Sequence, residues 1–196
     1  MKRTFLSALF LFFACIVNCQ TVQTIVEYKI DMPNENGNLI FYNAAAKKLS
    51  INDFLGRPND VGKIVAITSS GFSFKSAFKT KAGNTVLQMK VSCSFDKLKS
   101  WMKEEGKNKT ILNHEQRHFD LSYISCIQFI QKVKQAKFNN DNIKSLLNSM
   151  YDESIEALRI MQQQYDDETN NGTLSNQQEQ WNQKIDELLN ANKLQQ

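Results

Sequence analysis

The sequence has little histidine, few cysteines and no internal repeat. Two histidines and four cysteines occur among its 196 residues, and the lack of a repeat excludes a solenoid of equivalent units. No stretch rich in proline, glycine or serine separates two halves, so a second domain is not expected. No basic stripe with interleaved aromatic residues is present, and nucleic acid is therefore not an expected partner.

The composition is sufficient for one compact domain. Hydrophobic residues make up 41% of the chain and charged residues 22%, a balance typical of globular rather than disordered proteins. A chain of this length can bury a hydrophobic core of ordinary size.

The N-terminal segment has the layout of a secretory signal peptide. Lys2 and Arg3 form a positive start, residues 4–17 are almost wholly apolar, and the polar chain follows Cys19. The apolar run is too short to favour a permanent membrane-spanning helix. We therefore predict a signal peptide at 1–19 and one domain at 20–196, exported to the periplasm or the medium. Cleavage lowers the net charge from +4 to about +2.

Two alternatives remain for this segment. It could persist as a membrane anchor, or Cys15 or Cys19 could be lipidated, because the residues before each cysteine partly match a bacterial lipobox. In both cases the membrane would be contacted only through this segment.

Cys93 and Cys126 are the cysteines that remain after cleavage. In an oxidising compartment they could form a disulfide. The other outcome is a pair of buried thiols that pack as small hydrophobic groups.

The first half of the domain reads as strands. Phe72–Lys79 and Val22–Ile30 alternate between polar and apolar residues, which predicts a mainly antiparallel sheet with one solvated face. Further strands are expected at 39–42, 64–69 and 85–95. Residues 96–105 are predicted as a short helix.

The second half reads as helices. Apolar residues recur every three or four positions, which predicts helices at 111–134, 143–165 and 176–194. The first of these is expected to be amphipathic. Trp101 and Trp181 are expected in the core. Because the strands precede the helices, the predicted fold class is α+β.

Both histidines lie in one motif, His114-Glu115-Gln116-Arg117-His118, at the start of the first helix. Residues four apart share a helix face, so two imidazoles can bind one Zn²⁺. His114 and His118 are therefore predicted metal ligands, and Glu115 is the predicted general base that takes a proton from the attacking water. Arg117 is expected to be solvated, and Asp120 to lie on the far side of the helix.

The stretch from Ile111 to Leu121 resembles the signature of a bacterial family catalogued as domain of unknown function 922, described as predicted secreted zinc-dependent proteases. Members usually show His-Glu-Gln-Gly-His-Phe-Asp after a leucine-rich lead. Leu49–Gly56 resembles an upstream block of the family, and Tyr165–Gly172 resembles its Tyr-Asp-x-x-Thr-x-His-Gly block. The likeness spans about residues 25 to 187. It implies a zincin-like helix and a peptide or protein substrate.

The chain departs from the family at the third ligand. Asn171 stands where members usually have His, which is the natural third ligand there. Asn binds zinc poorly beside imidazole or carboxylate. Asp166 and Glu168 are nearby carboxylates that could replace it, and Glu153 and Glu156 on the second predicted helix offer another route.

These observations lead to one expected function and two alternatives. The chain is expected to be an exported zinc peptidase. The first alternative, based on Asn171, is a weakened or inactive relative that serves as an exported binding or structural domain. The second is another metal-dependent hydrolase, such as an amidase that acts on envelope material.

Overall fold

The computed structural model describes residues 22–34, 36–44, 48–59, 62–81 and 84–192. The predicted signal peptide, with its flanking cysteines Cys15 and Cys19, lies outside these residues. Among the described residues, no helix has the length and apolar character needed to cross a membrane.

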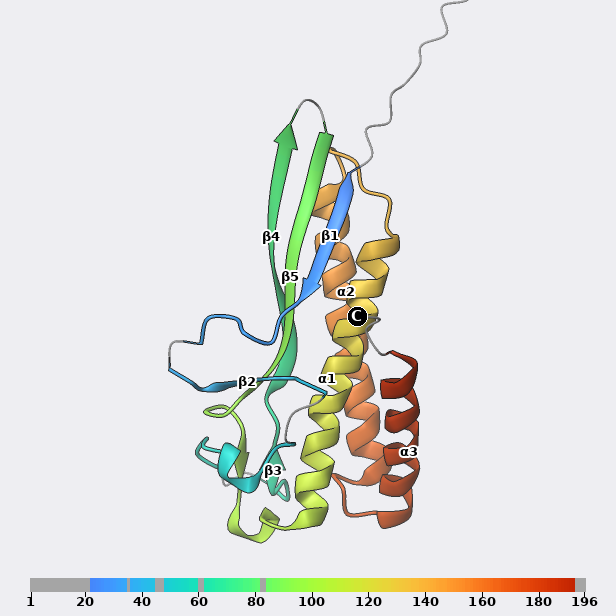
Figure 1. Cartoon of the computed structure of the whole chain (residues 1–196). Helices are drawn as coiled ribbons and strands as arrows, with labels where there is room; N and C mark the ends of the chain where they lie inside the picture. The colour runs from blue at the N-terminus through green and yellow to red at the C-terminus, as the bar shows by residue number, and fades with distance from the viewer. Residues whose placement is uncertain (1–21, 35, 45–47, 60–61, 82–83, 193–196) are drawn as a thin grey trace, which may run out of the picture.

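A four-stranded mixed sheet forms one layer of the molecule (Figure 1). Its central strand is β5 (Asn84–Asp96), which pairs with antiparallel β4 (Ser70–Lys81) along the whole length of β4. The other edge of β5 pairs first with β1 (Gln23–Tyr28) and then with β2 (Leu39–Phe41). A separate small sheet joins β3 (Ala66–Ile67) to antiparallel β6 (Trp101–Met102). Two short 3-10 turns lie at Ile51–Asp53 and Glu104–Gly106.

Three helices follow the strands, which confirms the α+β class. They are α1 (Lys109–Gln135), α2 (Ile143–Thr169) and α3 (Ser175–Ala191). The Asn108 side chain caps α1 by accepting a hydrogen bond from the Ile111 amide at 3.0 Å. α2 runs four residues beyond its predicted end and stops at Asn170, which adopts the left-handed conformation.

The structure differs from the predicted strands and helices in two places. β1 runs parallel to β5, so the sheet is mixed. An alternating pattern indicates which face of a strand is buried and carries no information on its partner's direction. Residues 96–105 form a turn, β6 and a 3-10 turn in place of the predicted helix. There the Asp96 carboxylate accepts hydrogen bonds from the backbone amides of Leu98 and Lys99, which competes with helical bonding.

Helix α1 occupies the centre of the molecule (Figure 1). The sheet packs on one side of it, and α2 and α3 pack on the other. Every residue from His114 to Ile127 is buried, so the prediction of an amphipathic helix was wrong for this stretch. The central position explains the difference, because a helix covered by both a sheet and two helices has no solvent face.

The core lies between the sheet and α1 and continues beneath α2 and α3. Trp101 and Trp181 are both buried, as predicted. Cys93 on β5 and Cys126 on α1 are buried there as free thiols, which favours the second of the two outcomes expected for them. Burial raises the pKa of the Cys93 thiol well above its usual value.

Candidate metal centre

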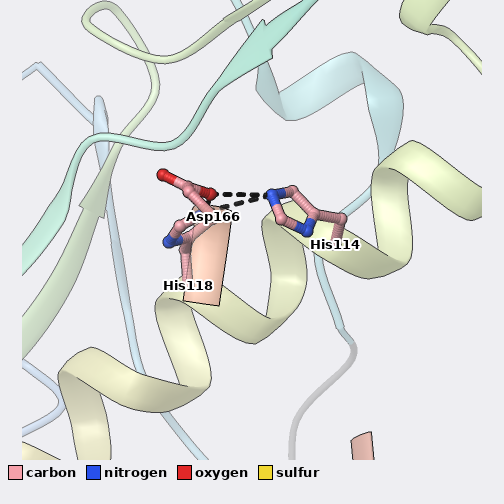
Figure 2. A group of neighbouring side chains, drawn as sticks. All are labelled: His114, His118 and Asp166. Atoms are coloured by element: carbon pink, nitrogen blue, oxygen red, sulfur yellow. Dashed lines mark hydrogen bonds and ion pairs between the residues drawn. The ribbon is translucent and has the colours of Figure 1, made fainter. Parts of the chain in front are cut away.

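The two motif histidines lie on successive turns of α1 and face the same way (Figure 2). Their Nε2 atoms are 3.2 Å apart. Both side chains are buried, with 2% of His114 and 7% of His118 exposed. The structure therefore confirms that these two residues share one face of the helix.

A carboxylate from α2 completes the group. The Oδ1 atom of Asp166 lies 3.0 Å from His114 Nε2 and 2.9 Å from His118 Nε2 (Figure 2). Of the acidic residues weighed as replacements for the usual third histidine, Asp166 is the one that the fold brings to the motif. His114, His118 and Asp166 together form a group that could hold a metal ion.

The charges in this group favour a bound cation. Burial raises the pKa of the Asp166 carboxyl, but hydrogen bonds donated by His114 and His118 outweigh burial and hold that pKa well below its usual range. Burial lowers the pKa of His118, but its hydrogen bond to Asp166 and the charges of Glu115 and Asp166 outweigh this effect and raise it. A carboxylate that stays ionised beside two imidazoles stabilises positive charge between them.

The donor set and its spacing fit a small divalent metal ion. Two imidazole nitrogens and one carboxylate oxygen are a ligand set found in catalytic zinc sites. Tetrahedral bonds of about 2.0–2.1 Å place two ligand atoms about 3.3 Å apart. The separations of 2.9, 3.0 and 3.2 Å among the three donors are close to that value.

Glu115 lies beside the three donors and is buried, with 4% of the residue exposed. Its Oε2 atom has no hydrogen-bond partner among the described residues. Such atoms are rare in folded proteins and call for a partner such as a water molecule, an ion or a substrate. Glu115, His114, His118 and Asp166 all line one cavity of about 180 Å³, whose apolar wall comes from Ile64, Ala66 and Ile67. A small polar molecule in this cavity could reach the carboxylate.

The turn after α2 supplies another part of the cavity wall. Asn170, Asn171 and Gly172 all have positive φ angles, of 48°, 52° and 78°. Asn171 lines the same cavity as His114, His118 and Asp166. Gly172 packs against the first histidine, because a Cβ atom there would lie 2.8 Å from the Cβ and Cγ atoms of His114. This position therefore requires glycine for both its backbone angle and its close approach.

The other candidate carboxylates on α2 have different partners. Glu168 accepts hydrogen bonds from Trp181 Nε1 at 2.8 Å and from Gln164 Nε2 at 2.6 Å. Glu153 accepts one from the Ser149 hydroxyl, and Glu156 pairs with Arg159. All three lie outside the group of His114, His118 and Asp166.

Arg117 is buried, so the prediction of a solvated charge was wrong. Its Nη1 atom donates to Asp120 on α1 at 3.0 Å and to Asp186 on α3 at 2.7 Å. Asp120 also accepts from the Tyr42 hydroxyl and from Gln116 Nε2. Asp120 lines a different cavity from the one that the two histidines line, in agreement with its expected place on the far side of the helix. α3 covers Arg117, and its Asp186 carboxylate replaces the lost contact with water.

Two residues at the site were not predicted from the sequence. The Tyr165 ring stacks on His114 with centroids 4.5 Å apart. Gln178, in the first turn of α3, places its Oε1 atom 3.0 Å from His114 Nδ1. The only hint of a role for Tyr165 in the sequence is its place next to Asp166. Nothing in the sequence indicates a role for Gln178, because it is one of many glutamines on a polar helix.

No protein-family model, curated protein or solved structure matches this chain.

Proposed function

We propose that the chain is an exported zinc-dependent peptidase of the kind that its motif resembles. The observation that carries the proposal is the convergence of two imidazoles, one ionised carboxylate and a second carboxylate with one unpartnered oxygen on one cavity. Zinc is the metal inferred, since imidazole and carboxylate donors at tetrahedral spacing are its usual ligands.

His114, His118 and Asp166 would hold the ion, and Glu115 would move the proton. Zinc bound there would supply Lewis acidity, which makes water a stronger acid and polarises a carbonyl. The Oε2 atom of Glu115 accepts the proton of the attacking water and later returns it to the amine that leaves. Burial of this oxygen without a partner keeps it available for that transfer.

Asp166 weakens the case for an inactive relative. The main support for that alternative was Asn171, which stands where the resembled family has its third ligand. An anionic oxygen at 2.9 and 3.0 Å from the two histidine nitrogens is a better zinc donor than an amide. We therefore favour an active enzyme with Asp166 as its third ligand.

The general base is tested by Glu115→Gln. The purified protein should hold about one zinc per chain and cleave some members of a peptide mixture. Glu115→Gln should keep the zinc and slow cleavage by about 10²–10⁴-fold. Glu153→Gln changes an exposed carboxylate and should alter neither. A zinc-free protein after metal loading, or unchanged cleavage by Glu115→Gln, would overturn the proposal.

The ligand assignment is tested separately by zinc affinity. Asp166→Asn should weaken zinc binding by more than about tenfold, since even residues behind the ligands contribute that much. Asn171→Ala should have a smaller effect, because it leaves all three donors in place. If Asn171→Ala caused the larger loss in chelator competition, Asn171 and not Asp166 would be the third ligand.

A further inference from the structure

The outer nitrogen of the first histidine has a buried partner on a different helix. His114 Nδ1 lies 3.0 Å from Gln178 Oε1, and only 2% and 4% of these two residues are exposed. The same imidazole directs Nε2 at Asp166 and His118. Whether Nδ1 carries a hydrogen therefore decides which ring nitrogen is free to bind a metal.

The orientation of the Gln178 amide follows from a chain of contacts that starts at Arg117. A guanidinium can only donate, so the Asn182 atom 3.1 Å from Arg117 Nε must be the amide oxygen. That oxygen also lies 3.0 Å from the Gln178 amide, whose facing atom must then be the donor Nε2. Asn113 Nδ2 donates to the same Asn182 oxygen at 3.1 Å.

The remaining Gln178 atom is then fixed as an acceptor. With Nε2 turned to Asn182, and also donating to the Tyr165 hydroxyl at 2.7 Å, Oε1 faces His114. The Tyr165 hydroxyl in turn donates to the His114 carbonyl at 3.3 Å. Because Oε1 can only accept, His114 Nδ1 must carry hydrogen. Nε2 faces Asp166, and it is the nitrogen at which a metal ion would take the place of the proton shared with that carboxylate.

We propose that Gln178 is a positioning residue that fixes the tautomer and ring direction of His114. Arg117, acting through Asn182, determines which end of the Gln178 amide faces His114. Helix α3 thus contributes to the proposed metal centre through Gln178, which contacts a ligand and not the metal. The inference rests on the metal site proposed above. It also gives a role to Arg117, which stands where the resembled family commonly has glycine.

The tautomer can be read directly in the unaltered protein. In zinc-loaded protein, the ring ¹⁵N signals of His114 should show a protonated Nδ1 and a metal-bound Nε2. Signals with metal on Nδ1 would overturn the proposal without any substitution.

Zinc affinity of Gln178 variants provides the second test. Gln178→Leu keeps the size of the side chain and removes the acceptor, so affinity should fall by about 10–100-fold. Gln178→Glu keeps an acceptor and should bind zinc more tightly than Gln178→Leu. Gln177→Leu, at an exposed position on the same helix, is the matched control and should bind as the unaltered protein does. Equal affinity of Gln178→Leu and the control would overturn the proposal.

The relay through Asn182 has its own pair of variants. Asn182→Asp still accepts from Arg117 and Gln178, so the ring ¹⁵N pattern of His114 should be unchanged. Asn182→Leu removes the acceptor and should mix the two tautomers; an unchanged pattern would exclude the relay.

A His114→Ala variant separates the two proposals. If it loses zinc while Gln178→Leu does not, the metal site stands and Gln178 has no positioning role. If it keeps zinc, the metal site itself is wrong.

Discussion

At the scale of single residues, Gly172 is packed against His114 of the candidate metal centre and has no side chain that could act as a ligand. Its φ of 78° is unfavourable for other residues, and an added Cβ would lie 2.8 Å from His114 Cγ. Gly37 has a similar φ of 65° with no atom near the added Cβ. Substitutions at both positions strain the backbone, but only a substitution at Gly172 would also displace His114.

We expect Gly172→Ala to weaken zinc binding and Gly37→Ala to leave it unchanged. Both should lower the free energy of unfolding by about 1–2 kcal/mol, the cost of a left-handed backbone at a residue with a Cβ. Gly172→Ala should lose more, because the ring of His114 must move. Urea unfolding and chelator competition measure the two effects. Equal zinc affinities in the two variants would show that Gly172 does not position His114.

The sequence allowed only part of this site to be predicted at the residue scale. The spacing of His114 and His118 was enough to place both on one face, because the helical repeat is fixed. Asp166 could not be singled out from the other carboxylates by sequence. It is 48 residues from His118 in the chain, and its approach to the histidines depends on how α2 packs against α1. Gln178 depends in addition on the docking of α3, and no local pattern encodes that.

At the scale of elements, α1 is held to α3 by a buried charge cluster. Arg117 lies between Asp120, of which 1% is exposed, and the half-exposed Asp186. Asp120 further accepts from Tyr42, which leads from β2 into the following loop. This cluster ties the motif helix to the sheet on one side and to α3 on the other.

Asp120→Ala should destabilise the protein by about 3 kcal/mol, because it leaves the buried Arg117 charge with only one carboxylate partner, Asp186. Its matched control is Glu156→Ala, which removes an exposed ion pair with Arg159 on α2 and should leave the urea midpoint unchanged. A similar midpoint for both variants would mean that the cluster contributes no more than an ordinary surface pair.

Elements were predictable where a periodic pattern was long. All three helices were found with ends within a few residues, because each carries a sustained apolar repeat. The turn and short strand at 96–102 were not predicted. A two-residue strand such as β6 forms only because it pairs with a partner strand, here β3, and its own sequence shows no periodic pattern. The parallel direction of β1 likewise depends on its long-range partner.

At the scale of the whole molecule, the two thiols lie deep between the sheet and α1. Cys93 and Cys126 are each 0% exposed, and burial raises the pKa of both. Thiolate is the reactive form. Because a raised pKa keeps each thiol protonated, raising the pH to about 9 should not activate them as it would a free cysteine.

We expect Cys93 and Cys126 to resist a thiol-reactive dye in the folded protein from pH 7 to about 9. After unfolding in urea without reductant, both should react. Mass spectrometry of the labelled peptides identifies the sites. Labels absent after unfolding, and restored by a reductant, would reveal a disulfide between them and contradict the free thiols of the structure.

The location of Gln178 on α3 also sets an order of events during synthesis. Chains emerge from the ribosome with the N-terminus first, and α3 (Ser175–Ala191) comes after both α1 and α2. His114, His118, Asp166 and Glu115 are therefore all made before the residue that we propose fixes the imidazole. A chain exported as proposed also crosses the membrane N-terminus first, so firm metal capture is expected only once the third helix has emerged.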